Sequence, residues 1–97
     1  MKRVILLDAA DNVATALEPL VPGDVIAVPE KEVSVEIRES IAFEHKFALI
    51  PIRKGEYVCK YGVPIGAAYQ DIAPGEHVHL HNLRSLMEEA DEGGAEV

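Results

Sequence analysis

The segment Leu20-Val21-Pro22-Gly23-Asp24-Val25-Ile26 occurs twice more in this chain in altered form. The other two copies read Ile52-Arg53-Lys54-Gly55-Glu56-Tyr57-Val58 and Ile72-Ala73-Pro74-Gly75-Glu76-His77-Val78. Each copy runs from an aliphatic residue through two spacers to glycine, an acid, any residue and a second aliphatic residue. Glycine permits a tightly turned backbone, the acid can accept hydrogen bonds from nearby amides, and the last aliphatic residue suits the start of a strand. The pattern therefore predicts three turns, each of which leads into a strand.

The segments around these turns are short and predict a mainly β domain. The run from Lys2 to Leu7 is β-branched and aliphatic, as in a buried strand, and apolar residues alternate with polar ones from Asp24 to Ile41. A short helix is expected up to Leu17, with Asp11 or Asn12 as its cap, because a proline follows soon after. The expected fold class is mainly β, with one or two short helices.

Length and charge limit the classes of function. The chain has 97 residues and a formal net charge of −8, which suffices for one compact domain but not for a deep, enclosed catalytic cavity. A negative field repels phosphate backbones and anionic lipids, so nucleic acid and membrane surfaces are not expected partners. The apolar runs are shorter than a signal-peptide core or a membrane span, which predicts a cytoplasmic protein. The single cysteine, Cys59, excludes an internal disulfide and is expected to be a small apolar strand residue.

The composition changes close to the C-terminus. Acidic residues crowd there among glycines and alanines, namely Glu88, Glu89, Asp91, Glu92 and Glu96. We therefore expect a folded domain over residues 1–84 and an acidic, flexible tail over residues 85–97. The alternative is that this segment is a linker towards a larger domain.

The segment Glu76-His77-Val78-His79-Leu80-His81-Asn82 has the densest set of chemically active side chains. If it is extended, His77, His79 and His81 share one face, and imidazoles bind ferrous, zinc or manganese ions well. Neighbours on one face of a strand lie about 6.5–7 Å apart, so two could share one ion, and three would need the strand to bend. Asn82 could bind a substrate hydroxyl or close the turn. The alternative for the histidines is a solvent-facing edge.

The fourth histidine lies in a second candidate segment. Phe43, Phe47 and Leu49 are expected core anchors, which leaves His45 and Lys46 on an exposed corner. A His-Lys pair of this kind could bind a carboxylate by charge and hydrogen bonding, and the alternative is an ordinary solvated corner.

The segment Lys60-Tyr61-Gly62-Val63-Pro64-Ile65-Gly66 predicts a hairpin with a specific bend, because glycines flank its proline. Lys60 or Tyr61 could present a charge or a hydroxyl group to a ligand at that bend. The alternative is a purely structural hairpin.

The order and spacing of seven short motifs resemble the N-terminal module of altronate and galactarate dehydratases, which is also similar to the small subunit of sulfolactate sulfo-lyase. The motifs are Asp11-Asn12-Val13-Ala14, His45-Lys46-Phe47-Ala48-Leu49, Lys54-Gly55-Glu56, Lys60-Tyr61-Gly62, Pro64-Ile65-Gly66, Gly75-Glu76-His77-Val78-His79 and His81-Asn82. The resemblance covers residues 4–82. One difference is Glu44, which stands where relatives usually have glycine before the His-Lys pair.

This resemblance implies an SAF-type β-clip domain and a large catalytic dehydratase subunit as partner, either fused or separate. It implies that the chain is the small subunit, or the detached N-terminal domain, of a sugar-acid dehydratase. That enzyme eliminates water from a hexonic or hexaric acid, such as altronate or galactarate, and leaves a 2-keto-3-deoxy acid. It also implies ferrous iron, held mainly by the large subunit.

The expected site residues fall into three groups. Carried onto this sequence, the resemblance implies catalytic roles for His77, His79, His45 and Lys46 and substrate-binding roles for Asn82 and Asn12, to which the hairpin adds Lys60. The metal ligands expected from spacing are His77, His79 and His81.

Other functions remain compatible with the same residues. The chain could be a non-catalytic module that binds a sugar acid or a protein, the small subunit of a sulfolactate sulfo-lyase, or a structural domain with incidental histidines. Exposed strand edges would also permit a homo-oligomer. The motifs do not distinguish water from sulfite as the leaving group, nor one hydroxy acid from another.

Overall fold

A computed structural model describes residues 2–85 of the chain. Those residues contain nine short strands and one turn of 3₁₀ helix, and this confirms the predicted mainly β class. The elements are β1 (Val4–Ile5), β2 (Val13–Ala16), β3 (Val25–Val28), η1 (Pro29–Lys31), β4 (Val33–Glu36), β5 (Lys46–Ala48), β6 (Tyr57–Lys60), β7 (Val63–Ala68), β8 (His77–Val78) and β9 (Leu83–Ser85). The predicted acidic tail lies, apart from Ser85, outside the described residues.

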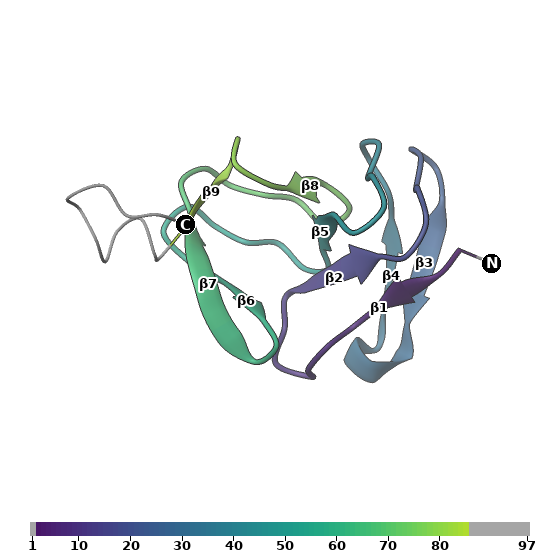
Figure 1. Ribbon diagram of the computed structural model, residues 1–97, viewed down its shortest axis with the longest axis horizontal. Helices are drawn as coiled ribbons and strands as arrows, with labels where there is room; N and C mark the ends of the chain where they lie inside the picture. Colours follow the sequence, from purple (N-terminus) through teal and green to yellow (C-terminus); the bar gives the residue numbers. More distant parts are fainter. Residues whose placement is uncertain (1, 86–97) are drawn as a thin grey trace.

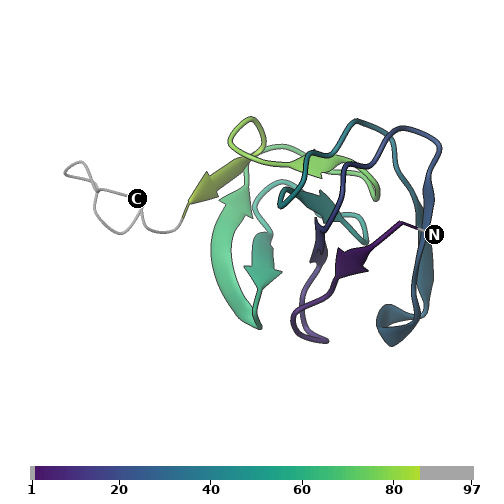
Figure 2. The same cartoon turned by 45° about the vertical axis from the view of Figure 1, so that its right-hand side comes forward.

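The strands form three small antiparallel sheets. The central sheet has the order β1-β2-β5-β8 and lies between a β3–β4 hairpin on one side and a β6-β7-β9 sheet on the other (Figure 1). The turned view in Figure 2 keeps the same arrangement. Because β5 and β8 are neighbours in the central sheet, this sheet brings together two chain segments that carry histidines.

The three copies of the turn pattern adopt the predicted structure. Gly23, Gly55 and Gly75 have φ values of 98°, 93° and 87°, which only glycine adopts at low cost. Each acid accepts a hydrogen bond from the backbone N–H three residues earlier, namely Asp24 from Val21 at 3.0 Å, Glu56 from Arg53 at 2.8 Å and Glu76 from Ala73 at 2.9 Å. The turns lead directly into β3, β6 and β8, so this prediction is confirmed.

A fourth turn with the same plan lies before β5, and it was not apparent from the sequence because it lacks glycine. Ile41 holds the position of the first aliphatic residue and pairs with Leu20. Glu44 holds the glycine position with φ of 70°, and His45 takes the place of the acid. Its backbone N–H bonds to the carbonyl of Ala42 at 2.9 Å. The turn therefore carries an imidazole where the other three turns carry a carboxylate.

Replacing Glu44 with glycine should stabilise the fold. A side chain at positive φ costs roughly 1 kcal/mol, so we expect Glu44→Gly to raise the free energy of unfolding by about 0.5–1 kcal/mol in urea titrations. Glu44→Ala is the matched control, because it removes the carboxylate but keeps the Cβ. Equal stability of the glycine and alanine variants would contradict this explanation.

The predicted helix between Asp11 and Leu17 is wrong, because the residues of its expected core form β2. Pairing with β1 on one side and β5 on the other outweighs a helical preference that is weak over so short a segment. Asp11 and Asn12 do not cap a helix but bond to β6 and to the turn after it. The buried Asp11 carboxylate accepts from the backbone N–H groups of Tyr61 at 3.0 Å and Gly62 at 2.8 Å, in the turn between β6 and β7.

The predicted strands and hairpins are otherwise confirmed, with two differences. Residues 24–41 contain the β3–β4 hairpin with alternating burial, and Lys60 to Gly66 contain the β6–β7 turn. The N-terminal run forms only two strand residues at a sheet edge. Phe43 is 54% exposed, so its prediction as a core anchor is wrong. It is a spacer in the fourth turn and its side chain faces solvent.

The core consists of two clusters of buried hydrophobic residues. The larger one packs between the central sheet and the β3–β4 hairpin and includes Leu20, Ile26, Ile37 and Phe47. The smaller one lies under the β6-β7-β9 sheet and includes Val58, Ile72, Val78 and Leu83. Phe47 of β5 and Val78 of β8 belong to different clusters, so the β5–β8 pair lies between both cores and is held from two sides.

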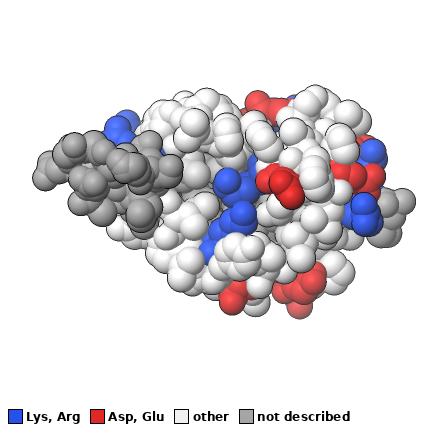
Figure 3. Space-filling model, in the orientation of Figure 1, with Lys and Arg blue, Asp and Glu red and all other residues white. Residues whose placement is uncertain are grey.

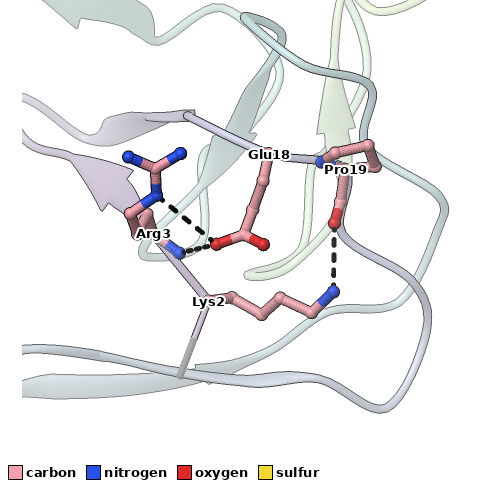
Figure 4. A network of polar contacts seen from close by, with 4 residues as sticks. All are labelled: Lys2, Arg3, Glu18 and Pro19. Atoms are coloured by element: carbon pink, nitrogen blue, oxygen red, sulfur yellow. Dashed lines mark hydrogen bonds and ion pairs between the residues drawn. The ribbon is translucent and has the colours of Figure 1, made fainter.

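The N-terminal segment is tied to the chain that follows β2 (Figure 4). The backbone N–H of Arg3 donates to the Glu18 carboxylate at 2.6 Å, and Lys2 donates to the carbonyl of Pro19 at 3.4 Å. The Arg3–Glu18 ion pair at 3.8 Å is exposed and contributes little by itself. No helix within residues 2–85 is long and apolar enough to span a membrane.

Candidate functional site

Three of the four histidines meet where β5 and β8 pair. In this antiparallel pair Phe47 lies opposite His77 and Lys46 opposite Val78. The same register, carried one residue further, brings His45 opposite His79. Segments that are more than thirty residues apart in the sequence therefore place their imidazoles at one end of a two-strand ladder.

The three rings form a stacked group. Nδ1 of His45 lies 2.8 Å from Nε2 of His77, and the ring centroids of His45 and His79 are 4.8 Å apart. The rings of His77 and His79 are nearly parallel, at 10°, with centroids 5.3 Å apart. An N–H···N bond requires one donor and one acceptor nitrogen, and an accepting imidazole is neutral. At least one ring of the His45–His77 pair is therefore neutral.

The segment after β8 is not extended up to Asn82, so that prediction is wrong. The strand ends at Val78, and the backbone turns back with a bond from the N–H of Asn82 to the carbonyl of His79 at 3.0 Å. The three predicted metal ligands therefore do not form a row. His81 lies tilted at 5.5 Å from the ring of His77, and His45 takes the third place in the close group.

Asn82 holds the histidine segment in place. Its side chain is buried, accepts from the backbone N–H of His79 at 3.0 Å and donates to the carbonyl of His77 at 2.8 Å. Both polar atoms thus bond to the backbone, which gives Asn82 a positioning role, and its contact with substrate stays a prediction. Glu39 adds a second tether, because its carboxylate accepts from the backbone N–H of His77 at 2.7 Å.

Lys46, the first residue of β5, follows His45 and lies opposite Val78, so its side chain leaves the other face of the strand from His45. It is close enough to Lys60 and His79 for the charges of these groups to interact. Burial lowers the pKa of the Lys46 ammonium group below its ordinary value, and the positive charge of Lys60 lowers it further. Figure 3 shows lysine and arginine atoms gathered in the middle of this face, with an acidic side chain beside them. A hollow of about 350 Å³ is lined by Glu44, Lys60 and Tyr61 together with Ile5, Leu7, Thr15 and Leu17. Its charged lining residues are thus one lysine and one glutamate.

Asn12 has a structural role in the described chain. Its side chain donates to the carbonyl of Tyr57 at 3.0 Å and accepts from the backbone N–H of Cys59 at 2.9 Å. It joins the start of β2 to β6, and its predicted contact with substrate stays a prediction. Cys59 lies within β6 as predicted. The structural roles of Asp11 and Glu39 carried no signal in the sequence, since both depend on partners far away in the chain.

Partial burial lowers the pKa values of His77 and His79 below the ordinary histidine value. The neighbouring imidazoles lower both pKa values further, and at His79 the charge of Lys46 adds to this effect. For His77, Glu39 opposes this shift. Both shifts favour the neutral form of these rings.

The pH dependence of stability follows from these shifts. The unfolded chain takes up protons on these histidines at a higher pH than the folded chain does, so stability is complete above the ordinary value of 6.5 and is lost as the pH falls below it. We expect the free energy of unfolding to fall from pH 7.5 to pH 5.5, measured by urea titration with a chelator present. The fall should be smaller for the His77→Gln/His79→Gln double variant, and an identical pH profile would contradict the assignment.

Comparisons with known proteins agree with this fold. Residues 2–86 match the family described as the altronate/galactarate dehydratase SAF domain. The altronate dehydratase of Escherichia coli (strain K12) is 47% identical over 88 residues, which are 91% of this chain and 17% of that enzyme. The altronate dehydratase of Bacillus subtilis (strain 168) is 39% identical over 87 residues, again 17% of its length. The chain therefore matches only a small share of these relatives.

A second group of relatives is closer in size to this chain. The (2R)-sulfolactate sulfo-lyase subunit alpha of Chromohalobacter salexigens is 38% identical over 56 residues, which are 58% of this chain and 60% of that subunit. The relatives are thus parts or subunits of larger lyases.

Proposed function

Because this chain belongs to the altronate/galactarate dehydratase SAF domain family, we propose that it supplies part of the active site of a sugar-acid dehydratase. The substrate is a hexonic or hexaric acid, and the product is a 2-keto-3-deoxy acid. The rest of the site comes from a large dehydratase part, fused or separate. Ferrous iron, if this enzyme uses it, supplies a Lewis acid for the carboxylate and the leaving hydroxyl group.

The observation that carries the proposal is the hydrogen-bonded His45–His77 pair. Elimination of water removes the weakly acidic proton at C2 and the hydroxyl group at C3, and the enol that results becomes the 2-keto acid. These steps need a base near C2, a cation for the carboxylate and an acid for the leaving oxygen. A neutral imidazole of the pair can accept the C2 proton, and the N–H···N bond lets the second ring share the charge.

Lys46 fits the part of the carboxylate anchor. Its ammonium group is partly buried and lies close enough to Lys60 and His79 for their charges to interact. A substrate carboxylate bound there would relieve the repulsion between these groups. Lys60 adds long-range attraction at the edge of the neighbouring hollow. Asn82 and Glu39 act by positioning, because they fix the backbone on both sides of His77.

The described residues also explain why a large part is needed. The hollow beside Lys60 and Tyr61 is shallow and open to solvent, whereas elimination next to a carboxylate is favoured in a site that excludes water. A covering partner would exclude water from the histidine group and bring the missing acid or metal ligands.

Recovery of the tagged chain from its native lysate tests this proposal. The recovered material is assayed for 2-keto-3-deoxy acid formation from altronate and from galactarate with added ferrous iron. A co-purifying large dehydratase part together with product formation is the expected result. A chain that comes down alone and inert would contradict the proposal and favour a module that only binds sugar acids, to be followed by thermal-shift screening.

A second candidate function is supported by the sulfo-lyase relatives, which are separate alpha subunits. In that case the same imidazole pair would take a proton next to a carboxylate, and sulfite would leave in place of water. The same recovered material, supplied with (2R)-sulfolactate, decides between the two, because release of sulfite without any reaction of sugar acids would replace the dehydratase proposal.

A further inference from the structure

We infer that His45, His77 and His79 form a binding site for one divalent transition-metal ion of the zinc or ferrous class, with all three nitrogen ligands supplied by this chain. This differs from the row of ligands expected from sequence spacing, because the third ligand is His45 and not His81. The inference concerns the same histidines as the proposed function. An imidazole that binds the ion has no lone pair left for the C2 proton, so with the ion bound these histidines would hold the metal and the base would come from the large dehydratase part. The binding itself is tested independently of any activity.

The distances between the ring nitrogens suit a common ion. Each histidine offers one nitrogen, and the three nitrogens lie within 4.8 Å of one another. Tetrahedral coordination with bonds of about 2.1 Å places ligand nitrogens roughly 3.4 Å apart. The His45–His77 contact of 2.8 Å has to open by a few tenths of an ångström, and the longest separation has to close by about 1.4 Å. Small χ rotations achieve both, since solvent adjoins the partly buried rings.

The backbone that presents the rings is fixed before any ion binds. His77 lies in β8, whose pairing with β5 sets the distance to His45. The side chain of Asn82 bonds to the backbone on both sides of Val78, and Glu39 bonds to the N–H of His77. Sites whose supporting groups are already bonded lose little entropy when the ligands converge. Only the side-chain rotations remain to be made.

The protonation state also favours a metal. Metal ligands must be neutral imidazoles, and the short contact between His45 and His77 requires at least one neutral ring. An ion would take the place of the proton that lies between the two rings. That proton would then move to the other nitrogen of the ring that donated it. The three imidazoles leave at least one position open, and Lys46 lies close enough to His79 to affect its charge.

Metal titration of the purified full chain, stripped of metal with a chelator, tests this inference. Calorimetric titration with zinc chloride is expected to give one ion per chain with a Kd below about 10 µM. Cobalt(II) should give the intense visible absorption of a tetrahedral site. Single variants His45→Gln, His77→Gln and His79→Gln should each weaken binding by about 100-fold, whereas His81→Gln should change it by less than about threefold.

Thermal unfolding in chelator establishes that each variant is folded. A second measurement needs no variant, because correlation spectra of the histidine side chains of the unaltered chain should show His45, His77 and His79 shifting together on addition of zinc, and His81 little. Equal affinity of the His45→Gln and His81→Gln chains, or no binding by the unaltered chain, would overturn the inference. Product formation by the recovered complex is scored separately, so either proposal can fail while the other stands.

Discussion

A chain that carries His77→Gln is expected to support sugar-acid dehydration with a kcat about 10²- to 10⁴-fold lower than that of the unaltered chain. The reason is the loss of one half of the imidazole pair, since glutamine can keep a hydrogen bond to His45 but cannot take the substrate proton. KM should change less, because Lys46, which we assign to the carboxylate, is untouched. The measurement is steady-state formation of 2-keto-3-deoxy acid by the complete enzyme.

The matched control is His81→Gln, which removes an imidazole outside the close group and should leave kcat within about threefold. If the two rings act as one unit, the double variant His45→Gln/His77→Gln should be little slower than either single variant. Thermal unfolding checks that each variant is folded. Equal rates for the His77 and His81 variants would refute the assignment of the proton-accepting group.

The second large effect is expected at Gly75, the glycine of the turn before β8. A Cβ at this position would overlap the carbonyl oxygen of Glu36 and lie 3.0 Å from its carbonyl carbon, and φ is +87°. Both atoms are backbone, so the clash cannot be relieved by moving a side chain. The same turn also bonds to Ala48 and Arg38 through its backbone. We expect Gly75→Ala to lower the free energy of unfolding by at least about 3 kcal/mol.

Gly55→Ala is the control for this prediction, because Gly55 has the same place in the turn pattern, with φ of +93°, and a Cβ added there would have no atom within 4 Å. It should cost only about 1 kcal/mol, the strain of positive φ. Urea titration of both variants gives the comparison. A similar loss in both would show that backbone conformation alone, and not contact with the Glu36 carbonyl, makes Gly75 necessary.

The turns were predictable because their chemistry is local. Glycine, the acid that follows it and the backbone amide that the acid binds all lie within four residues, so the pattern around Gly23, Gly55 and Gly75 can be read directly. The fourth turn could not be recognised, because Glu44 stands where the pattern has glycine and a glutamate does not signal a positive φ. Its φ is set by tertiary structure, in which Ile41 pairs with Leu20. The prediction of a helix up to Leu17 was wrong for a related reason, since strand pairing and not local preference determined the structure there.

The site was predictable only in its parts. The spacing of His77 and His79 pointed to paired imidazoles, and the His45-Lys46 pair was found as a separate corner. Their meeting depends on the β5–β8 pairing, which no local pattern encodes. His81 was grouped with His77 and His79 by extending the alternation of a strand beyond its end at Val78, whereas the structure brings His45 into the close group with them. Asp11 and Glu39 act through backbone groups remote in sequence, so their roles required the fold.

A transplant of this chain into a relative tests most directly whether the chain supplies part of a dehydratase active site. Residues 2–86 of this chain replace the matching segment of the Escherichia coli altronate dehydratase, and turnover of altronate is measured. If this chain supplies its share of the active site, the chimera should work within about tenfold of the parent enzyme, a difference of roughly 1.4 kcal/mol in the barrier, and His77→Gln within it should abolish most of that rate. A chimera that folds and assembles like the parent, yet turns over altronate no faster than its His77→Gln form, would contradict the account.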